Sequence, residues 1–201
     1  MKLVVATQNS GKLREYRTLL AESGVGLSSL ADHPGAPQVE ETGDTYLANA
    51  RLKAHALAAF CQLPALADDS GLEVDALNGL PGVRSARFAA DAGLPAGDRS
   101  NVSLLLDRLA GVPDARRTAR FRCVIVVARP DGHELIAEDT CEGRITRAAR
   151  GSGGFGFDPV FLYPPLQRTF AELDAAEKDR VSHRAGAVRR LTPALGAFLS
   201  D

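Results

Sequence analysis

A short apolar run that ends in two adjacent carboxylates constrains this chain more than any other feature. Residues 63–67 form the run, and Asp68 and Asp69 follow it directly, before Ser70 and Gly71. Such a run is typical of a short buried strand, so the carboxylates are expected at its carboxyl end, where open α/β sheets bind their ligands. A solvated turn is the alternative, because Asp-Asp-Ser-Gly is also ordinary turn composition.

The N-terminal segment predicts a strand, a polar loop and a helix in succession. Residues 2–6 indicate a buried strand, and apolar side chains recur at helical spacing over residues 13–20. The loop between them consists of Thr7, Gln8, Asn9, Ser10, Gly11 and Lys12. It presents backbone N–H groups where the helix macrodipole favours an anion, so it predicts a phosphate site. Ala6 and Leu13 exclude a Walker A motif, and a plain N-cap with an exposed lysine is the alternative.

A second helix is predicted from about residue 44 to residue 60, with two acidic residues just before it. Asn49 and Lys53 are four residues apart within it, so their side chains share one helical face that can carry polar groups toward a cleft. Glu40 and Glu41 can instead be solvated acids near the helix N-terminus, and this is the preferred interpretation for Glu40.

The second half of the chain predicts a β-hairpin and then a glycine-rich loop. Residues 119–128 and 134–141 indicate the two strands of the hairpin. Residues 151–156 satisfy G-x-G-x-x-G, but the strand before it and the helix after it that a dinucleotide fold requires are missing. We expect a backbone that bends closely around a flat ligand, with Phe155 and Phe157 available to stack on a base. The alternative places both phenylalanines in the core.

The charge balance argues against a nucleic-acid or membrane partner. The 24 Lys and Arg residues and 25 Asp and Glu residues give a formal net charge of −1, so any phosphate binding must be local. Cys61, Cys123 and Cys141 form no C-x-x-C pair, which argues against a disulfide framework and a structural zinc site. No apolar run approaches the length of a signal or membrane segment. We therefore expect one domain over residues 1–201, in the cytoplasm.

Six blocks in this order resemble the inosine/xanthosine triphosphate pyrophosphatase family. They are Thr7-Gln8-Asn9-x-x-Lys12, Glu41-Thr42-Gly43 with Asn49-Ala50, Asp68-Asp69-Ser70-Gly71-Leu72, Gly79-x-Pro81-Gly82 with Ser85-Ala86-Arg87, Gly153 to Pro159, and Ser182-His183-Arg184. The resemblance implies an elongated α/β fold with a mixed central sheet flanked by helices, two lobes with the active-site cleft between them, and a homodimer. It also implies Mg²⁺-dependent hydrolysis of ITP, dITP and XTP to the monophosphate and pyrophosphate.

The same resemblance assigns roles to individual residues. The loop at residues 7–12 would hold the triphosphate, Glu41 and Asp69 would bind the metal, and Asp69 would accept the proton from water. The nucleotide contacts would come from Ser70, Phe155, Gly156, Phe157, Asp158, Lys178, His183 and Arg184. Lys12 and Lys53 can add positive charge beside the polyphosphate. The sequence does not divide the roles of base and ligand between Asp68 and Asp69, and we expect one of them to be mainly structural.

Two other functions compete with this one. The chain could be a pyrophosphatase for modified pyrimidine or standard nucleotides, or a nucleotide-binding module without catalysis. A 6-oxopurine offers an acceptor at O6 and a donor at N1, whereas adenine reverses both, so a donor such as His183 or Arg184 aimed at O6 would reject ATP. The sequence leaves open how GTP is excluded and which of ITP, dITP and XTP is preferred.

Overall fold

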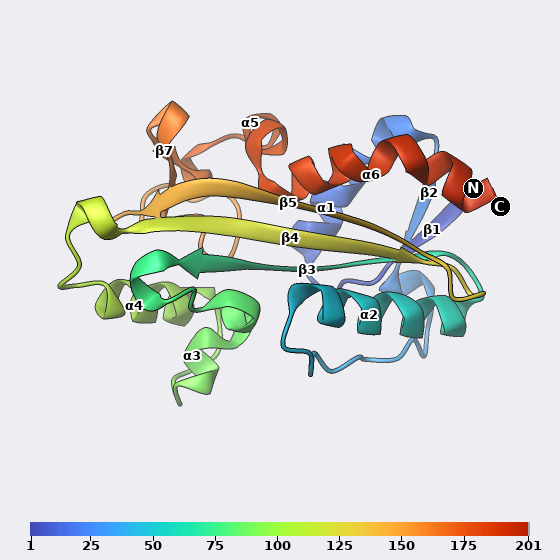
Figure 1. Cartoon of the computed structure of the whole chain (residues 1–201), viewed down its shortest axis with the longest axis horizontal. Helices are drawn as coiled ribbons and strands as arrows, with labels where there is room; N and C mark the ends of the chain where they lie inside the picture. The colour runs from blue at the N-terminus through green and yellow to red at the C-terminus, as the bar shows by residue number, and fades with distance from the viewer. Residues whose placement is uncertain (201) are drawn as a thin grey trace. The chain divides into compact units, whose positions relative to one another are not determined.

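The computed structural model describes residues 1–200 and has an α/β fold (Figure 1). The strands are β1 (Lys2–Val5), β2 (Gly26–Ser29), β3 (Ala65–Val74), β4 (Thr118–Ala128), β5 (Glu134–Ile145), β6 (Phe161–Tyr163) and β7 (Arg168–Thr169). The α-helices are α1 (Ser10–Leu19), α2 (Tyr46–Cys61), α3 (Phe88–Asp91), α4 (Asp98–Arg108), α5 (Ala175–Val181) and α6 (His183–Ser200). Over this part of the chain, no helix has the length and apolar character that crossing a membrane requires.

The strands form one mixed sheet in the order β2-β1-β3-β4-β5-β6-β7. β1 runs parallel to β2 and β3, and β6 runs antiparallel to β5 and β7. The predicted hairpin is formed by β4 and β5, and its loop is closed by a 2.9 Å bond from Arg129 N–H to the carbonyl of His133. The expected α/β fold, with a mixed central sheet flanked by helices, is therefore confirmed.

The chain divides into two compact units, and strands β3, β4 and β5 each contribute to both. Unit 1 comprises Met1–Asp69, Cys123–Asp139 and the described residues from His183 onward. Unit 2 comprises Ser70–Arg122 and Thr140–Ser182. The single domain over 1–201 and the cleft between two lobes stay predictions.

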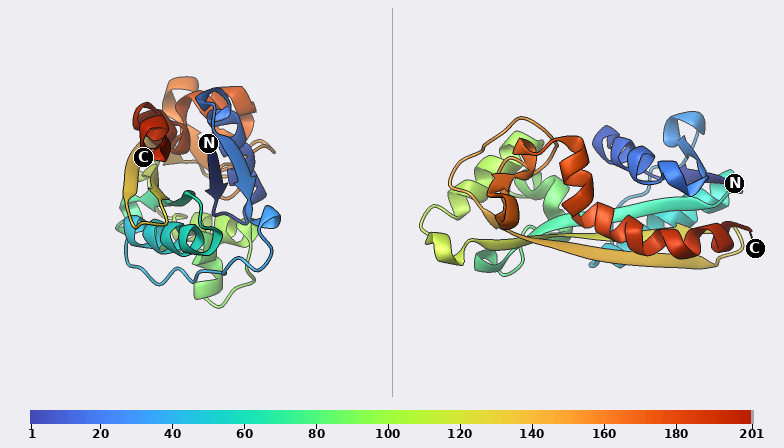
Figure 2. Two further views of the ribbon diagram at one scale, coloured as in Figure 1. Left: turned by 90° about the vertical axis from the view of Figure 1, so that its right-hand side faces the viewer. Right: turned by 90° about the horizontal axis from the view of Figure 1, so that it is seen from above.

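Unit 1 buries a separate core on each face of its part of the sheet. One core packs α1 and α6 onto the sheet and includes Leu3, Val5, Tyr16, Leu66, Cys123, Ile125, Val127, Val188 and Leu191. The other packs α2 onto the opposite face and includes Val4, Ala50, Ala54, Leu57, Ala65, Ala67, Val126 and Ala128. Figures 1 and 2 show α2 on one side of these strands and α1 and α6 on the other. The two sets alternate along each strand because successive strand side chains point to opposite faces.

The expected position of Asp68 and Asp69 at the end of a strand is wrong. They lie inside a continuous strand of 10 residues rather than at its end, because Ser70 and Gly71 remain extended instead of turning. The pairing of β1 with β3 ends at Val5 and Leu66, so Asp68 and Asp69 lie just past the end of the parallel neighbour. Strand alternation then sends Asp68 to the face of α1 and α6, and Asp69 to the face of α2.

Unit 2 packs around an aromatic cluster. The ring centroids of Phe121 and Phe161 are 4.5 Å apart, and those of Phe161 and Phe170 are 4.8 Å apart in an edge-to-face arrangement. Phe157 is buried in the same core, as the alternative interpretation of the glycine-rich loop predicted for this residue.

Arg117 ties three segments of unit 2 together from a buried position. Its guanidinium donates to the backbone carbonyls of Leu109, Ile145 and Thr146, at 2.7, 2.9 and 2.8 Å. Burial, with a smaller contribution from the nearby Arg147, lowers its pKa. Each donated bond satisfies a carbonyl in a part of the unit that is shielded from water.

Replacing Arg117 with Met is expected to lower the free energy of unfolding by about 2 kcal/mol, because it removes all three hydrogen bonds, although the Leu109 carbonyl still accepts from Val112 N. Denaturant titration measures the loss. The matched control is Arg116→Met at the exposed neighbouring position, where we expect almost no change. Equal losses in the two variants would show that the three bonds contribute nothing.

Candidate active site

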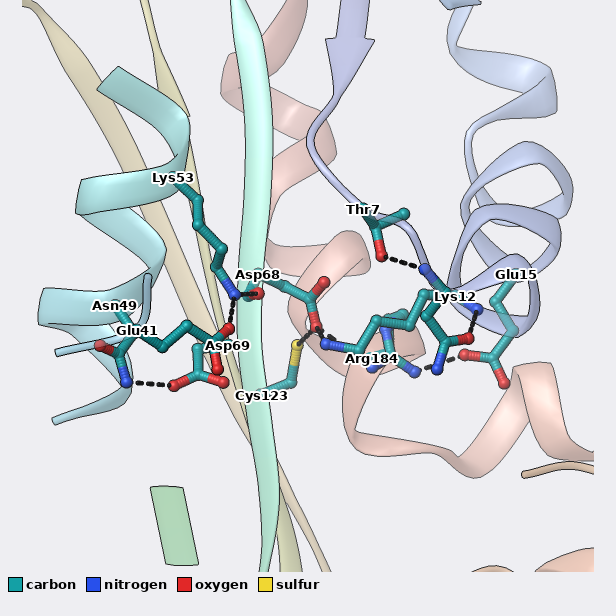
Figure 3. A network of polar contacts seen from close by, with 11 residues as sticks. Thr7, Lys12, Glu15, Glu41, Asn49, Lys53, Asp68, Asp69, Cys123 and Arg184 are labelled. Atoms are coloured by element: carbon teal, nitrogen blue, oxygen red, sulfur yellow. Dashed lines mark hydrogen bonds and ion pairs between the residues drawn. The ribbon is translucent and has the colours of Figure 1, made fainter. Parts of the chain in front are cut away.

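Asp68 lies at the centre of a buried ionic network in unit 1 (Figure 3). Its Oδ2 accepts from Lys12 Nζ at 2.8 Å and from Arg184 NH2 at 3.1 Å, and the Cys123 thiol lies 3.9 Å away. Arg184 also donates through NH1 to Glu15, and its side chain is only 2% exposed. Strand β3 and helices α1 and α6 thus meet through alternating charges rather than through apolar contact alone.

The loop between β1 and α1 keeps the form that the sequence predicted. Asn9 caps α1, since its side chain accepts from Lys12 N at 3.0 Å, and Asn9 N in turn donates to Thr7 Oγ1 at 3.1 Å. Gln8, Asn9 and Ser10 are exposed. The loop therefore offers polar groups to solvent at a helix N-terminus, which suits an anion.

Asp69 points to the opposite face of β3 and meets residues of α2 and of the segment before it (Figure 3). Its Oδ2 accepts from Asn49 Nδ2 at 3.0 Å, and Asn49 Oδ1 accepts from Gly43 N at 2.7 Å. Lys53 forms an ion pair with Glu41 and also donates to the backbone carbonyl of Asp68 at 2.7 Å. The residues that the sequence placed on one helical face thus converge on the second carboxylate.

The pKa values of the two neighbouring carboxyls, Asp68 and Asp69, are shifted in opposite directions. Burial alone would raise the pKa of Asp68, but the cations of Lys12 and Arg184 outweigh it and hold that pKa well below its usual range. Burial raises the pKa of Asp69, and the nearby Glu41 carboxylate reinforces the shift. Asp68 is therefore a fixed anion that balances buried cations, whereas Asp69 is a carboxylate that the fold disfavours as an anion. The two carboxyls thus have different environments, and their division into base and metal ligand stays a prediction.

The Glu41 and Asp69 carboxylates fit a Mg²⁺ site. The Glu41 carboxylate is close enough to contribute to the raised pKa of Asp69, and the Lys53 ammonium lies against Glu41 as a cation. Mg²⁺ prefers oxygen ligands and is often held by one or two carboxylates, with water and substrate phosphates completing its shell. Within residues 1–200 no group of three or more His, Cys, Asp and Glu side chains is arranged to hold a metal. Glu41 and Asp69 are the carboxylates that would contribute to such a site.

Unit 2 holds a second, separate group of predicted residues. Lys178 is buried, forms a 2.6 Å ion pair with Asp158, and lies 4.7 Å from the ring centroid of Phe155. Asp158 also accepts from Phe155 N at 2.9 Å. Gly154 adopts a φ of +70°, and a Cβ there would lie 2.0 Å from the Asp158 carboxylate, so this close approach requires glycine. The half-buried Phe155 ring is thus held between a fixed backbone and a cation.

Comparison with known proteins identifies the family. The sequence matches the profile of the Ham1 family over residues 3–194. This chain belongs to the Ham1 family. It is 52% identical over 190 residues to a dITP/XTP pyrophosphatase of Desulforamulus reducens, covering 94% of this chain and 93% of that protein. It is also 48% identical over 201 residues to a dITP/XTP pyrophosphatase of Exiguobacterium sibiricum, covering 100% of each.

Solved structures agree with this assignment. A HAM1 protein from Coxiella burnetii superposes on this Ham1 family member with a TM-score of 0.87 and 41% identity, over 98% of this chain and 99% of that one. The resemblance inferred from six sequence blocks is therefore confirmed, and it extends over both units.

The predicted site residues of this Ham1 family member fall into two groups. Unit 1 holds Thr7, Gln8, Asn9, Ser10, Gly11, Lys12, Glu41, Lys53, Asp69, His183 and Arg184, and unit 2 holds Ser70, Phe155, Gly156, Phe157, Asp158 and Lys178. His183 is buried as the first residue of α6. The roles of these residues toward metal and nucleotide stay predictions.

Sequence reasoning missed two members of the network in this Ham1 family member. Glu15 follows Lys12 by three residues in α1, so helical spacing was a usable signal for a shared charged face. Cys123 carried no such signal, because its contact with Asp68 joins strands whose pairing depends on the whole sheet. Burial raises the pKa of Cys123 to about 12, so this residue stays a thiol.

Proposed function

We propose that this chain is a nucleoside-triphosphate pyrophosphatase that hydrolyses non-standard purine nucleoside triphosphates, among them dITP, XTP and ITP, to the monophosphate and pyrophosphate. The observation that carries the proposal is that Asp69, held by Asn49, lies beside the Glu41–Lys53 ion pair where the pairing of β1 with β3 ends. Membership of the Ham1 family and the names of the relatives support the substrate class.

The chemistry divides between the loop after β1 and the carboxylates near α2. Thr7, Asn9 and Lys12 are positioned to bind phosphate oxygens through hydroxyl, amide and ammonium groups. Asp69 would accept the proton of a water that attacks the α-phosphorus, and its raised pKa supports this role. The bond between the α-phosphorus and the bridging oxygen breaks, so pyrophosphate leaves as an anion. The nucleoside monophosphate keeps the oxygen of the water.

A divalent metal would complete this arrangement. Glu41 and Asp69 would hold Mg²⁺, which supplies charge neutralisation of the polyphosphate when it is bound. Lys53, which forms an ion pair with Glu41, would add positive charge beside the metal and the polyphosphate. We also propose, from the family resemblance, that the working form is a homodimer.

Base selectivity is assigned to donors that meet the O6 acceptor of a 6-oxopurine. Arg184 and His183 remain the candidates, although NH1 and NH2 of Arg184 each already donate to a carboxylate. A substrate panel tests the assignment. We expect pyrophosphate from dITP, XTP and ITP in the presence of Mg²⁺ and little from ATP or GTP. Equal use of ATP would contradict an O6-reading pocket, and tight dITP binding without turnover would favour a binding module.

Phe155 provides a test of base stacking. Its half-buried ring lies against the Lys178 ammonium, and its backbone N–H is fixed by a bond to the Asp158 carboxylate, so the ring is suited to act as a platform. Base stacking on an aromatic side chain is worth about 1–3 kcal/mol. Phe155→Ala is therefore expected to lower kcat/KM for dITP by about 10- to 100-fold, mainly through a higher KM. Phe60→Ala, an exposed ring on α2, is the control, and equal kinetics for the two variants would refute the stacking role.

A further inference from the structure

A single buried amide links Asp69 to the chain segment that carries Glu41. Asn49 lies near the start of α2 and is fully buried, at 0% exposure. Its Oδ1 accepts from Gly43 N at 2.7 Å, and its Nδ2 donates to Asp69 Oδ2 at 3.0 Å. Glu41 is two residues before Gly43. The amide therefore spans from the segment that carries one carboxylate to the side chain that carries the other.

The chemistry of these groups fixes which way the amide faces. The backbone N–H of Gly43 can only donate, so it requires the oxygen of Asn49, and the NH₂ group must then face Asp69. Asp69 Oδ2 is consequently an acceptor from Asn49. The backbone N–H of Gly43 thus orients the Asn49 amide, and the amide in turn orients the Asp69 carboxylate.

We infer that Asn49 is a positioning residue that fixes the spacing of Glu41 and Asp69 for the metal. This inference rests on the proposed function and deepens it. Amide and carboxylate groups that hold metal ligands in place commonly change metal affinity or activity by about 10- to 100-fold when they are removed.

Gly43 gives the inference a second, independent support. A Cβ built on it would lie 2.7 Å from Ala48 Cβ, 2.8 Å from Asn49 Oδ1 and 3.2 Å from Asn49 N. The last contact is with helix backbone, which cannot move aside. Any larger residue would push the segment of Glu41 away from α2 and from the Asn49 amide, while the chemical identity of Asn49 and Asp69 stays unchanged.

Unit 2 contains a matched control. Asn101 is also buried, its Oδ1 accepts from Ala89 N at 2.8 Å, and its Nδ2 donates to the carbonyl of Ala86 at 3.2 Å. It bridges two backbone groups and has no part in the proposed chemistry. Substituting Asn by Leu at either position keeps the branching at Cγ, adds some volume and removes both bonds, so the two variants share the structural cost of losing a buried amide.

The experiment compares the full-length wild type with Asn49→Leu, Gly43→Ala and Asn101→Leu. It measures kcat and KM for dITP, the melting temperature, and the affinity for Mn²⁺ alone from water-proton relaxation. We expect Asn49→Leu to lower kcat about 100-fold and to weaken Mn²⁺ binding about 10-fold. Gly43→Ala should show the same two effects at smaller size. Asn101→Leu should lower the melting temperature while keeping kcat and Mn²⁺ affinity within about 2-fold of wild type.

Several results would overturn the inference. They are unchanged Mn²⁺ affinity in Asn49→Leu, a change in KM alone, or an equal loss of kcat in Asn101→Leu. If the wild type releases no pyrophosphate from dITP, the proposed function fails instead. The Mn²⁺ measurement on Asn49→Leu then still decides whether the amide sets the spacing of the two carboxylates.

Discussion

Replacing Asp69 with Asn is expected to lower kcat for dITP hydrolysis by about 10³-fold, since proton transfer by a positioned side chain typically contributes 10²- to 10⁴-fold. Asn removes the proton acceptor and one proposed ligand of the metal. The amide is nearly the same size as the carboxylate, and its oxygen can still accept from Asn49. Steady-state kinetics with a pyrophosphate readout measures the loss.

The same substitution should leave the fold intact. The pKa of Asp69 is raised, which means that folding disfavours its charged form, so a neutral side chain is tolerated there. We expect the melting temperature of Asp69→Asn to stay close to that of wild type. A variant with near-wild-type kcat would contradict the catalytic role. A variant that is inactive because it unfolds would contradict the electrostatic argument.

Asp68→Asn, one residue away, is expected to show the opposite pattern. Its carboxylate is 1% exposed and balances Lys12 and the buried Arg184, so removing the charge leaves those cations poorly compensated. Removal of one partner from a buried ion pair typically costs about 3–5 kcal/mol. Because Glu15 still neutralises part of the charge on Arg184, we expect about 3 kcal/mol, or a fall in melting temperature of about 10 °C.

The pH dependence of this network follows from the direction of the pKa shift. A carboxyl whose folded pKa lies below its unfolded value of about 4 stabilises the fold above that pH, and the stabilisation is lost as the pH falls toward the folded pKa. The wild-type advantage over Asp68→Asn should therefore be complete at pH 7 and shrink in acid. Asp69→Asn is the matched control. Equal melting temperatures for the two variants would contradict the division of roles.

Much of the site in unit 1 could be predicted from local patterns. The Thr7 to Lys12 loop follows from a strand, polar residues and helical spacing, and Asn49 and Lys53 share a face because they are four residues apart. The sequence identifies the two carboxylates as a pair but predicts them at a strand end. Ser70 and Gly71 have turn composition, and the sheet overrode that local preference.

The contacts that separate the roles of the two carboxylates could not be predicted locally. Arg184 meets Asp68 across 116 positions of the chain, and this contact requires α6 to pack on the same sheet face as α1. Sequence patterns specify which face of each element is apolar, but they do not specify which charged side chains meet when those faces pack. Once β3 is known to continue past Asp69, strand alternation explains why Asp68 and Asp69 point to opposite faces of the sheet.

The central claim is that water attacks the α-phosphorus of a non-standard purine triphosphate, and hydrolysis of dITP in H₂¹⁸O tests it most directly. Mass spectrometry of the products locates the new oxygen. The account predicts one ¹⁸O atom in deoxyinosine monophosphate and none in pyrophosphate. Label in pyrophosphate would show attack on the β-phosphorus, and orthophosphate release would show attack on the γ-phosphorus. Either result would contradict the account.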